Sequence, residues 1–244
     1  MIKSSFISEY YRLSRNILYS IIFIFPIYII HQAINLYFEL FTNIVIIKSA
    51  EKSFRSIFDV FGIYNFLAYF IFSTLLVLSI IIYNFSLFKD QLIQFKILFI
   101  MIIESALWAL VLLLFLSYEL LLSIIGVSID NVLYKLNICF GAGFWEELLF
   151  RLFLISFIIL IFNKMFRIDL FITVIIAILI SSLIFSLFHF EAFEINSIYN
   201  PLFLKRFLGG VFLGTLYIVR GLGISIYCHI FYDIIIFFDL ASFM

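Results

Sequence analysis

Long apolar runs, each close to the length of a bilayer crossing, are the feature that most limits how this chain can fold. The hydrocarbon core of a membrane is about 30 Å thick, and an α-helix needs about 20 apolar residues to cross it. Such runs recur along the whole sequence, in which 66% of residues are hydrophobic and 12% are charged. Soluble domains are about half apolar and a quarter charged. The sequence therefore predicts an all-α, polytopic transmembrane helix bundle.

Seven segments are long and apolar enough to be crossings. They are Ile17–Tyr37, Phe66–Leu87, Phe95–Leu116, Leu136–Phe162, Leu170–Phe190, Leu202–Val219 and Leu222–Leu240. Between the first two, Ser49–Tyr64 mixes charged residues with Phe and Ile, which predicts either an amphipathic helix at the membrane interface or a loop. The net charge is zero and no basic tract is present, so we expect a lipid bilayer and no nucleic acid as surroundings.

Three charged residues, Glu146, Glu147 and Arg151, lie inside the fourth segment in the sequence FWEELLFR. An ionised side chain at the centre of a transmembrane helix costs about 2.5–3.5 kcal/mol, so these groups should face protein or water. Helical spacing places Glu147 and Arg151 on one face, where they can pair, and turns Glu146 about 100° away. We interpret Glu147 as a structural acid and Glu146 as a candidate general base. A buried ion-pair network that only locks helices together is the alternative.

Two later segments carry histidine. His189 ends the fifth segment in FSLFHF, and His229 and Asp233 lie four residues apart, on one helix face, in YCHIFYD. A lone histidine at a helix end is often only a packed residue. A histidine one turn from a carboxylate can be a base with its orienting partner, a pair of metal ligands or a simple hydrogen bond. We expect His189, His229 and Asp233 to converge with Glu146.

The first three segments carry two isolated polar residues. We expect Glu104 to be an isolated protonated acid, with pairing to Arg151 as the alternative, and His31 to lie at the membrane interface. In the sixth segment, RFLGGVFLGTLY, Gly210 and Gly214 form a small-residue face that permits close helix contact.

These residues resemble the motifs of a known family. EExxxR fits Glu146, Glu147 and Arg151; FxxxH fits Phe185 and His189; FxxGxxxG fits Phe207, Gly210 and Gly214; HxxxN/D fits His229 and Asp233. In order and spacing the chain resembles the CPBP family, which contains the CAAX prenyl proteases of the Ras-converting type and the bacterial bacteriocin-processing and self-immunity proteins. We expect two parts: residues 1–135, membrane helices without diagnostic motifs, and residues 136–240, a catalytic helix bundle like that of the CAAX proteases.

The resemblance implies an intramembrane endopeptidase that cleaves a membrane-associated peptide or protein substrate. It implies that Glu146 and His189 activate a water molecule, that His229 and Asp233 bind or polarise the scissile carbonyl, and that Glu147 and Arg151 give structural support. Many members have Asn at the position of Asp233. An Asn amide can donate to an oxyanion, whereas an ionised Asp cannot. Asp233 is therefore protonated, orients His229 or ligates a metal.

Two questions stay open at the level of sequence. By residue type, Glu146, His189, His229 and Asp233 can ligate zinc, as the label metalloprotease implies, but no HExxH is present and we prefer a metal-free water. A non-proteolytic partner-binding protein, active in bacteriocin self-immunity or sensor modulation, and a transporter are the competing functions. The abundance of Ile and Phe and the two prolines are typical of an AT-rich bacterial genome, which predicts the bacterial cytoplasmic membrane as the location.

Overall fold

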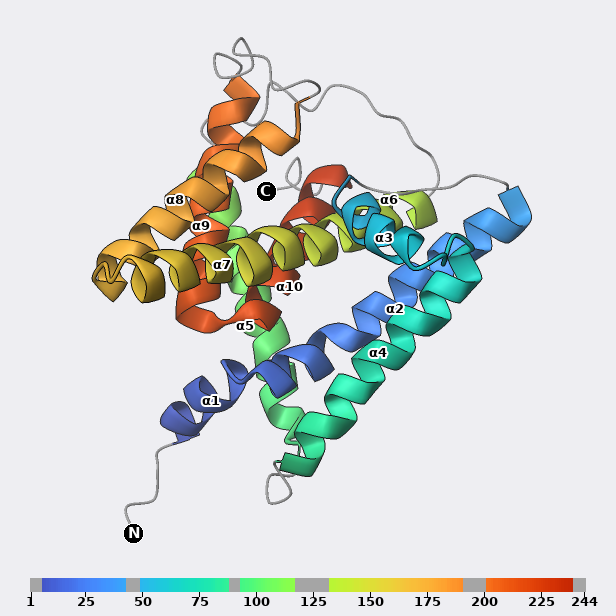
Figure 1. The fold of residues 1–244 in the computed structure, drawn as a ribbon, viewed down its shortest axis with the longest axis horizontal. Helices are drawn as coiled ribbons and strands as arrows, with labels where there is room; N and C mark the ends of the chain where they lie inside the picture. Colours follow the sequence, from blue (N-terminus) through green and yellow to red (C-terminus); the bar gives the residue numbers. More distant parts are fainter. Residues whose placement is uncertain (1–5, 43–48, 88–92, 117–131, 191–200, 239–244) are drawn as a thin grey trace.

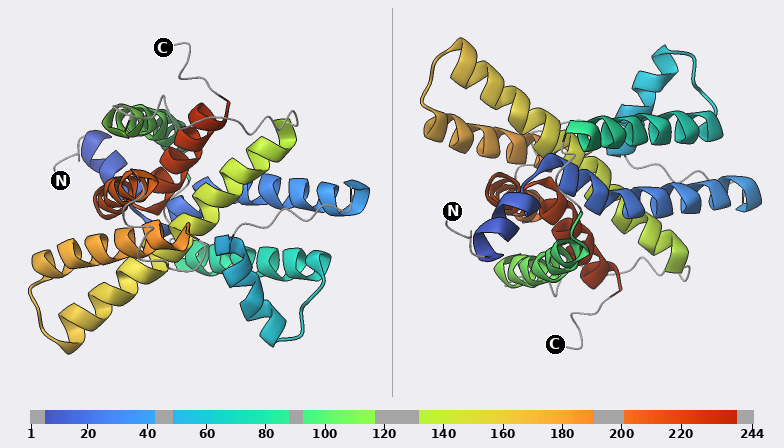
Figure 2. Two further views of the ribbon diagram at one scale, coloured as in Figure 1. Left: turned by 90° about the horizontal axis from the view of Figure 1, so that it is seen from above. Right: turned by 90° about the horizontal axis from the view of Figure 1, so that it is seen from below.

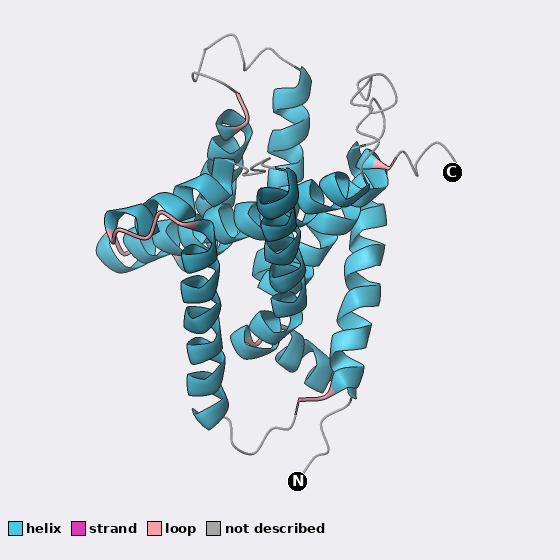
Figure 3. Cartoon of the chain, turned by 90° about the vertical axis from the view of Figure 1, so that its right-hand side faces the viewer, coloured by secondary structure: helices cyan, strands magenta, loops and turns pink. Residues whose placement is uncertain are grey.

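Helices make up the part of the chain that the structure describes. The computed structural model describes residues 6–42, 49–87, 93–116, 132–190 and 201–238, and no strand occurs in these ranges (Figure 3). Six helices are long and apolar enough to cross a membrane, and a seventh apolar helix, Leu222–Phe237, is shorter. The predicted all-α, polytopic bundle is confirmed. Large apolar side chains such as Leu114, Phe171 and Ile82 are exposed on its outer face, as lipid contact requires.

The helices follow one another through short connections. They are α1 (Phe6–Ser14), α2 (Ile17–Thr42), α3 (Ser49–Val60), α4 (Phe66–Leu87), α5 (Phe95–Leu116), α6 (Val132–Gly141), α7 (Ser156–Ile159), α8 (Leu170–Phe188), α9 (Pro201–Arg220) and α10 (Leu222–Phe237), with π-helical segments η2 (Ala142–Glu146), η3 (Leu148–Ile155) and η4 (Leu160–Met165) on either side of α7. Asp169 caps α8 by accepting from the amides of Phe171 and Ile172. Gly221, with φ of 90°, makes the tight turn between α9 and α10.

The region Ser49–Tyr64 forms a helix over most of its length, so the loop alternative is wrong. Ala50 and Glu51 at the start of α3 are fully buried, whereas Val60 and Phe61 at its end are largely exposed. Phe54 packs against Trp145, with ring centroids 5.0 Å apart. This amphipathic helix therefore lies directly on the segment that carries the tandem glutamates.

The rod from α6 to η4 is continuous helix but contains wide π turns, in which backbone hydrogen bonds reach five residues back. One such bond joins the Phe166 amide to the Ile161 carbonyl at 3.2 Å. Glu146 ends η2 and Arg151 lies in η3. The sequence indicated an ordinary helical spacing here. Since π turns occur often at functional sites, this local widening coincides with the residues that the motifs single out.

Helix α10 lies in the interior of the bundle and packs against α5, α9, α2, α6 and η2. Figure 1 shows α2 and α4 side by side, and Figure 2 shows the α6–α7 rod crossing the molecule diagonally. The main core joins residues from both expected parts of the chain, for example Phe23 of α2, Met101 of α5 and Ile226 of α10. The expected division near residue 135 stays a prediction.

Two glycines allow the closest helix approaches. A Cβ on Gly143 would stand 3.1 Å from the Ile230 backbone nitrogen, so η2 can touch α10 only because residue 143 is glycine. A Cβ on Gly210 would stand 3.1 Å from the Ser182 Cα, which brings α9 equally close to α8. Close contact of small residues supplies the packing that holds membrane helices together. The glutamate segment and the histidine-bearing helices are thereby brought to one place.

Candidate active site

His229 of α10 lies between carboxylates. Its Nδ1 is 3.0 Å from Glu147 Oε1, and its Nε2 is 4.0 Å from Glu146 Oε2 and 3.8 Å from Asp233 Oδ2. The ring is 6% exposed. Because a carboxylate held by an arginine only accepts, Nδ1 carries a proton and donates it to Glu147. The Nε2 edge is thus the side of His229 that faces Glu146 and Asp233.

His189 completes the group from the end of α8. Its Nδ1 donates to the Phe185 carbonyl at 2.8 Å, because a carbonyl can only accept, and its Nε2 is 3.5 Å from Glu146 Oε1. The His189 side chain is 24% exposed and that of Glu146 is 8% exposed. The side of the site formed by His189 is therefore its more accessible side. The backbone bond fixes the tautomer and leaves Nε2 directed at Glu146.

Glu147 has more partners than helical spacing indicates. Arg151 Nε is 3.3 Å from Glu147 Oε2, as expected, and the Ser225 hydroxyl donates to the same oxygen at 2.6 Å. Glu147 is completely buried and its other oxygen accepts from His229. The acid interpreted as purely structural therefore also orients His229. Sequence reasoning missed Ser225, although a serine one turn before His229 in an apolar helix is a readable signal.

Arg151 ties two motifs together. It is 1% exposed, and its guanidinium carbon lies 4.5 Å from the centroid of the Phe185 ring, a cation–π contact. Phe185 is the first residue of the FxxxH motif and also contacts the His189 ring edge to face, with centroids 4.8 Å apart. A change at Arg151 should thus be felt at both Glu147 and the helix end that carries His189.

The two predictions for the first half of the chain need correction. Glu104 is neither isolated nor paired with Arg151: it accepts from Arg220 at 2.5 and 2.8 Å, from Trp108 and from the Tyr10 hydroxyl. His31 is 1% exposed, with Nε2 3.3 Å from Glu51 Oε2, so it is buried between α2 and α3 and not interfacial. In both cases the partner is remote in sequence, and an intramembrane charge found compensation that no local pattern shows.

The zinc alternative fits the residues by type but not by arrangement. Among the residues that the structure describes, no three His, Cys, Asp or Glu side chains gather closely enough to hold a metal ion. Two of the four imidazole nitrogens are already committed, His229 Nδ1 to Glu147 and His189 Nδ1 to the backbone. Tetrahedral zinc needs three or four convergent ligands. We therefore derive no chemical step through a metal.

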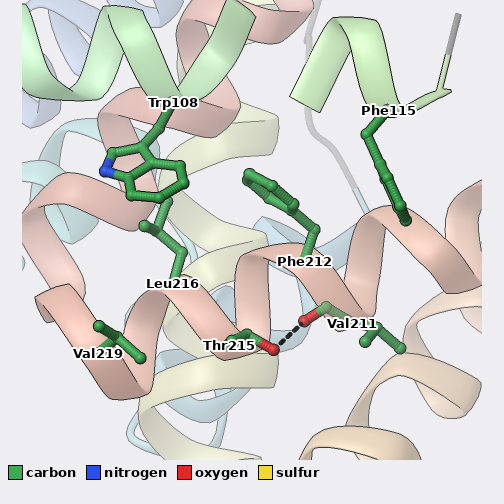
Figure 4. Close-up of a pocket in the computed structure, with 7 residues that line it drawn as sticks. All are labelled: Trp108, Phe115, Val211, Phe212, Thr215, Leu216 and Val219. Atoms are coloured by element: carbon green, nitrogen blue, oxygen red, sulfur yellow. Dashed lines mark hydrogen bonds between the residues drawn. The ribbon is translucent and has the colours of Figure 1, made fainter. Parts of the chain in front are cut away.

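An apolar groove of about 290 Å³ lies apart from these residues, between α5 and α9 (Figure 4). Trp108 and Phe212 face one another across it, and its lining includes no residue of the Glu, His and Asp constellation. The groove is open to the outer, lipid-facing surface of the bundle and plays no part in the arrangement around His229.

A polytopic helix bundle that gathers two glutamates, an arginine and two histidines from its C-terminal helices defines a class of protein, the CAAX-type intramembrane proteases. The family described as type II CAAX prenyl endopeptidase Rce1-like matches residues 128–235, and through this region the chain belongs to that family. The resemblance of residues 140–235 to the CAAX proteases is thereby confirmed. No curated protein and no solved structure matches the chain.

Proposed function

We propose that the protein is an intramembrane endopeptidase in which Glu146 and His189 activate a water molecule for attack on a peptide bond. The observation that carries this proposal is the pairing of Glu146 Oε1 with His189 Nε2 at 3.5 Å, beside His229. That separation is long for a direct hydrogen bond and suits a bridging water. Glu146 accepts a proton from this water as it attacks, and the proton passes to the leaving amine.

His229 has the geometry to act on the carbonyl of the substrate. Its Nδ1 proton is held by Glu147, so a donor at Nε2 requires the protonated ring, and three nearby carboxylates stabilise that positive charge. A protonated Nε2 can donate to the oxygen on which negative charge develops during attack. Glu147, Ser225 and Arg151 hold the ring in place. In this assignment Asp233 stabilises His229.

A network that only locks helices has no need for the accessible half of this site. Glu147, Arg151 and Ser225 are completely buried and mutually paired, which is sufficient for helix packing. Glu146 and His189 lie beside this buried set and remain partly accessible. This difference favours a peptidase over a purely structural or partner-binding role. Small membrane peptides or bacteriocin-like precursors as substrates, and the bacterial cytoplasmic membrane as the location, are further proposals that rest on composition.

The function is tested with the full chain in proteoliposomes that also contain membrane peptides from the cells that make it. Incubation in H₂¹⁸O should produce new fragments whose new C-terminal carboxylate carries ¹⁸O, detected by mass spectrometry. Proteoliposomes without the protein are the control. Fragments that are equally abundant in the control, or none at all with folded protein, would contradict an endopeptidase.

Asp233→Asn separates the three roles left open for Asp233. If the carboxylate only stabilises His229, the amide oxygen still accepts a hydrogen bond and we expect cleavage to fall by about tenfold, the loss of one charge-assisted contact. If Asp233 must be neutral in order to donate, activity should be preserved. If it ligates zinc, activity and bound zinc should fall together, and added zinc should restore both. Metal analysis of the purified wild type decides the last case, because stoichiometric zinc that the variant loses would overturn the metal-free assignment.

A further inference from the structure

A second cluster of polar side chains lies between α2, α3, α4 and the start of the glutamate rod. Its members share near-complete burial, with exposures between 0% and 5%; they are His31, Gln32, Glu51, Tyr69, Asn137 and Trp145. Four of the six precede residue 128, where the family match begins. This second polar cluster therefore belongs mostly to the part of the chain without diagnostic motifs, and the proposed reaction does not use it.

Direct contacts make these side chains one cluster. His31 Nε2 is 3.3 Å from Glu51 Oε2, and the Asn35 amide joins His31 at 3.2 Å to Asn137 at 2.7 Å. Gly141 packs against the His31 ring so closely that a Cβ would stand 2.7 Å from it. The cluster thus touches the rod five residues before Glu146.

An aromatic side of the cluster reaches closer to the candidate active site. The rings of Tyr69 and Trp145 lie 6.5 Å apart, and the Arg55 guanidinium lies over Tyr69 at 5.1 Å. Gln32 lies near the Tyr69 hydroxyl without the geometry of a hydrogen bond. Trp145 immediately precedes Glu146 in the chain. The cluster therefore extends from Glu51 to the residue next to the proposed base.

Many polar atoms of the cluster lack a hydrogen-bond partner among the described residues. They are His31 Nδ1, Gln32 Nε2 and Oε1, Glu51 Oε1, Tyr69 Oη, Asn137 Oδ1 and Trp145 Nε1. Nearly all buried polar groups in native proteins are hydrogen-bonded, to protein or to ordered water. So many unpaired atoms in one region indicate a polar ligand of small size.

The chemistry of these atoms identifies the ligand. The set contains donors, at Gln32, Tyr69 and Trp145, as well as acceptors, at Gln32, Glu51 and Asn137. A cation would be bound by acceptors alone and repelled by the Arg55 guanidinium, and an anion would be repelled by Glu51. Water both donates and accepts and is neutral. Buried waters of this kind typically make about three hydrogen bonds each.

We propose that the second polar cluster is a water-binding compartment that supplies the hydrolytic site at Glu146. The supply role rests on the proposed function, because hydrolysis consumes one water molecule for each peptide bond. Lipid-facing helices surround the site with apolar side chains. A polar compartment that begins at Trp145 gives water a bound position next to the site.

Hydroxyl-radical labelling by pulsed X-rays tests the binding of water in the full-length protein in nanodiscs. Radicals form from water where it is bound, so Tyr69 and Trp145 should be oxidised several-fold faster than their burial alone allows. Tyr19 is the matched control, since it is 3% exposed and its hydroxyl accepts from the Gln94 amide. Labelling of Tyr69 and Trp145 no faster than that of Tyr19 would overturn the compartment.

Gln32→Leu gives a second, thermodynamic test. In a hydrated compartment, leucine removes two groups that bind water, and we expect Tm to fall by about 2–4 °C. In a dry cluster, leucine removes two unpaired polar atoms, and Tm should rise. Asn35→Leu is the control, because both amide atoms of Asn35 are bonded and its Tm should fall in either case. A rise in Tm for Gln32→Leu would overturn the proposal.

The supply role is read from the kinetics of the same variant. We expect the kcat of Gln32→Leu to fall by about tenfold with unchanged KM, as expected when delivery of water and not binding of substrate is impaired. Labelled Tyr69 and Trp145 together with an unchanged kcat would overturn the supply role. If the wild type shows no ¹⁸O incorporation, the proposed function fails, whereas the labelling and the Tm still decide whether the compartment holds water.

Discussion

Glu146→Gln is expected to insert and fold normally while the rate of peptide cleavage falls by about 10²–10⁴-fold. Glutamine keeps the size of the side chain and one acceptor oxygen but cannot take a proton from water. Glu146 is 8% exposed and lies 3.5 Å from His189, so the exchange removes the proposed base with little change in packing. Rates of fragment formation in proteoliposomes give the measurement, with circular dichroism and Tm as checks on folding.

Glu39→Gln is the matched control for this exchange. Glu39 lies in α2, outside all four motifs, and the same chemical change there should leave the cleavage rate unaltered. If Glu146→Gln retained the full biological activity of the wild type, the role of general base would be wrong, and a partner-binding protein that does not cleave would become the better interpretation.

Arg151→Ala is expected to have the largest effect on stability, about 3–5 kcal/mol, because breaking a buried pair leaves an uncompensated charge. Arg151 is 1% exposed, pairs with Glu147 and lies over Phe185, so its removal affects both motifs. We expect the amount of folded protein in the membrane to fall sharply before any change in chemistry can be measured. Quantitative immunoblotting of membranes and thermal unfolding in detergent provide the readout.

The double variant Arg151→Ala with Glu147→Gln tests the cause. If the loss comes from the unpaired carboxylate, neutralising Glu147 should restore part of the stability, and the two changes should not add. Normal abundance and Tm of Arg151→Ala, combined with lost cleavage, would instead place Arg151 in the chemical mechanism and contradict a supporting role.

Local sequence spacing predicted those parts of the site that lie on one helix. Glu147 and Arg151, and likewise His229 and Asp233, are four residues apart, and each pair does face the same way, at 3.3 and 3.8 Å. The family motifs added order and spacing, which were enough to expect Glu146, His189 and His229 together. Predictions of this kind succeed because helical geometry fixes the relative direction of near neighbours, whatever the remainder of the chain does.

Contacts between helices were beyond local spacing. Glu147 meets His229 across 82 residues, and Glu104 meets Arg220 across 116. Ser225 reaches Glu147 only because Gly143 lets η2 approach α10. No periodicity specifies which distant helix will face a given charge, and for this reason Glu104 and His31 were placed wrongly.

By itself, then, the sequence determined the membrane-spanning helical class, the approximate crossings and the residues that carry the family's chemistry. It did so through hydrophobic run length and through positions on single helices, which are local properties. Only the tertiary structure decided that Glu147 orients His229, that Glu104 belongs to Arg220 and that His31 is buried against Glu51. An intramembrane charge must be compensated by some partner, but the choice of partner depends on how the helices pack.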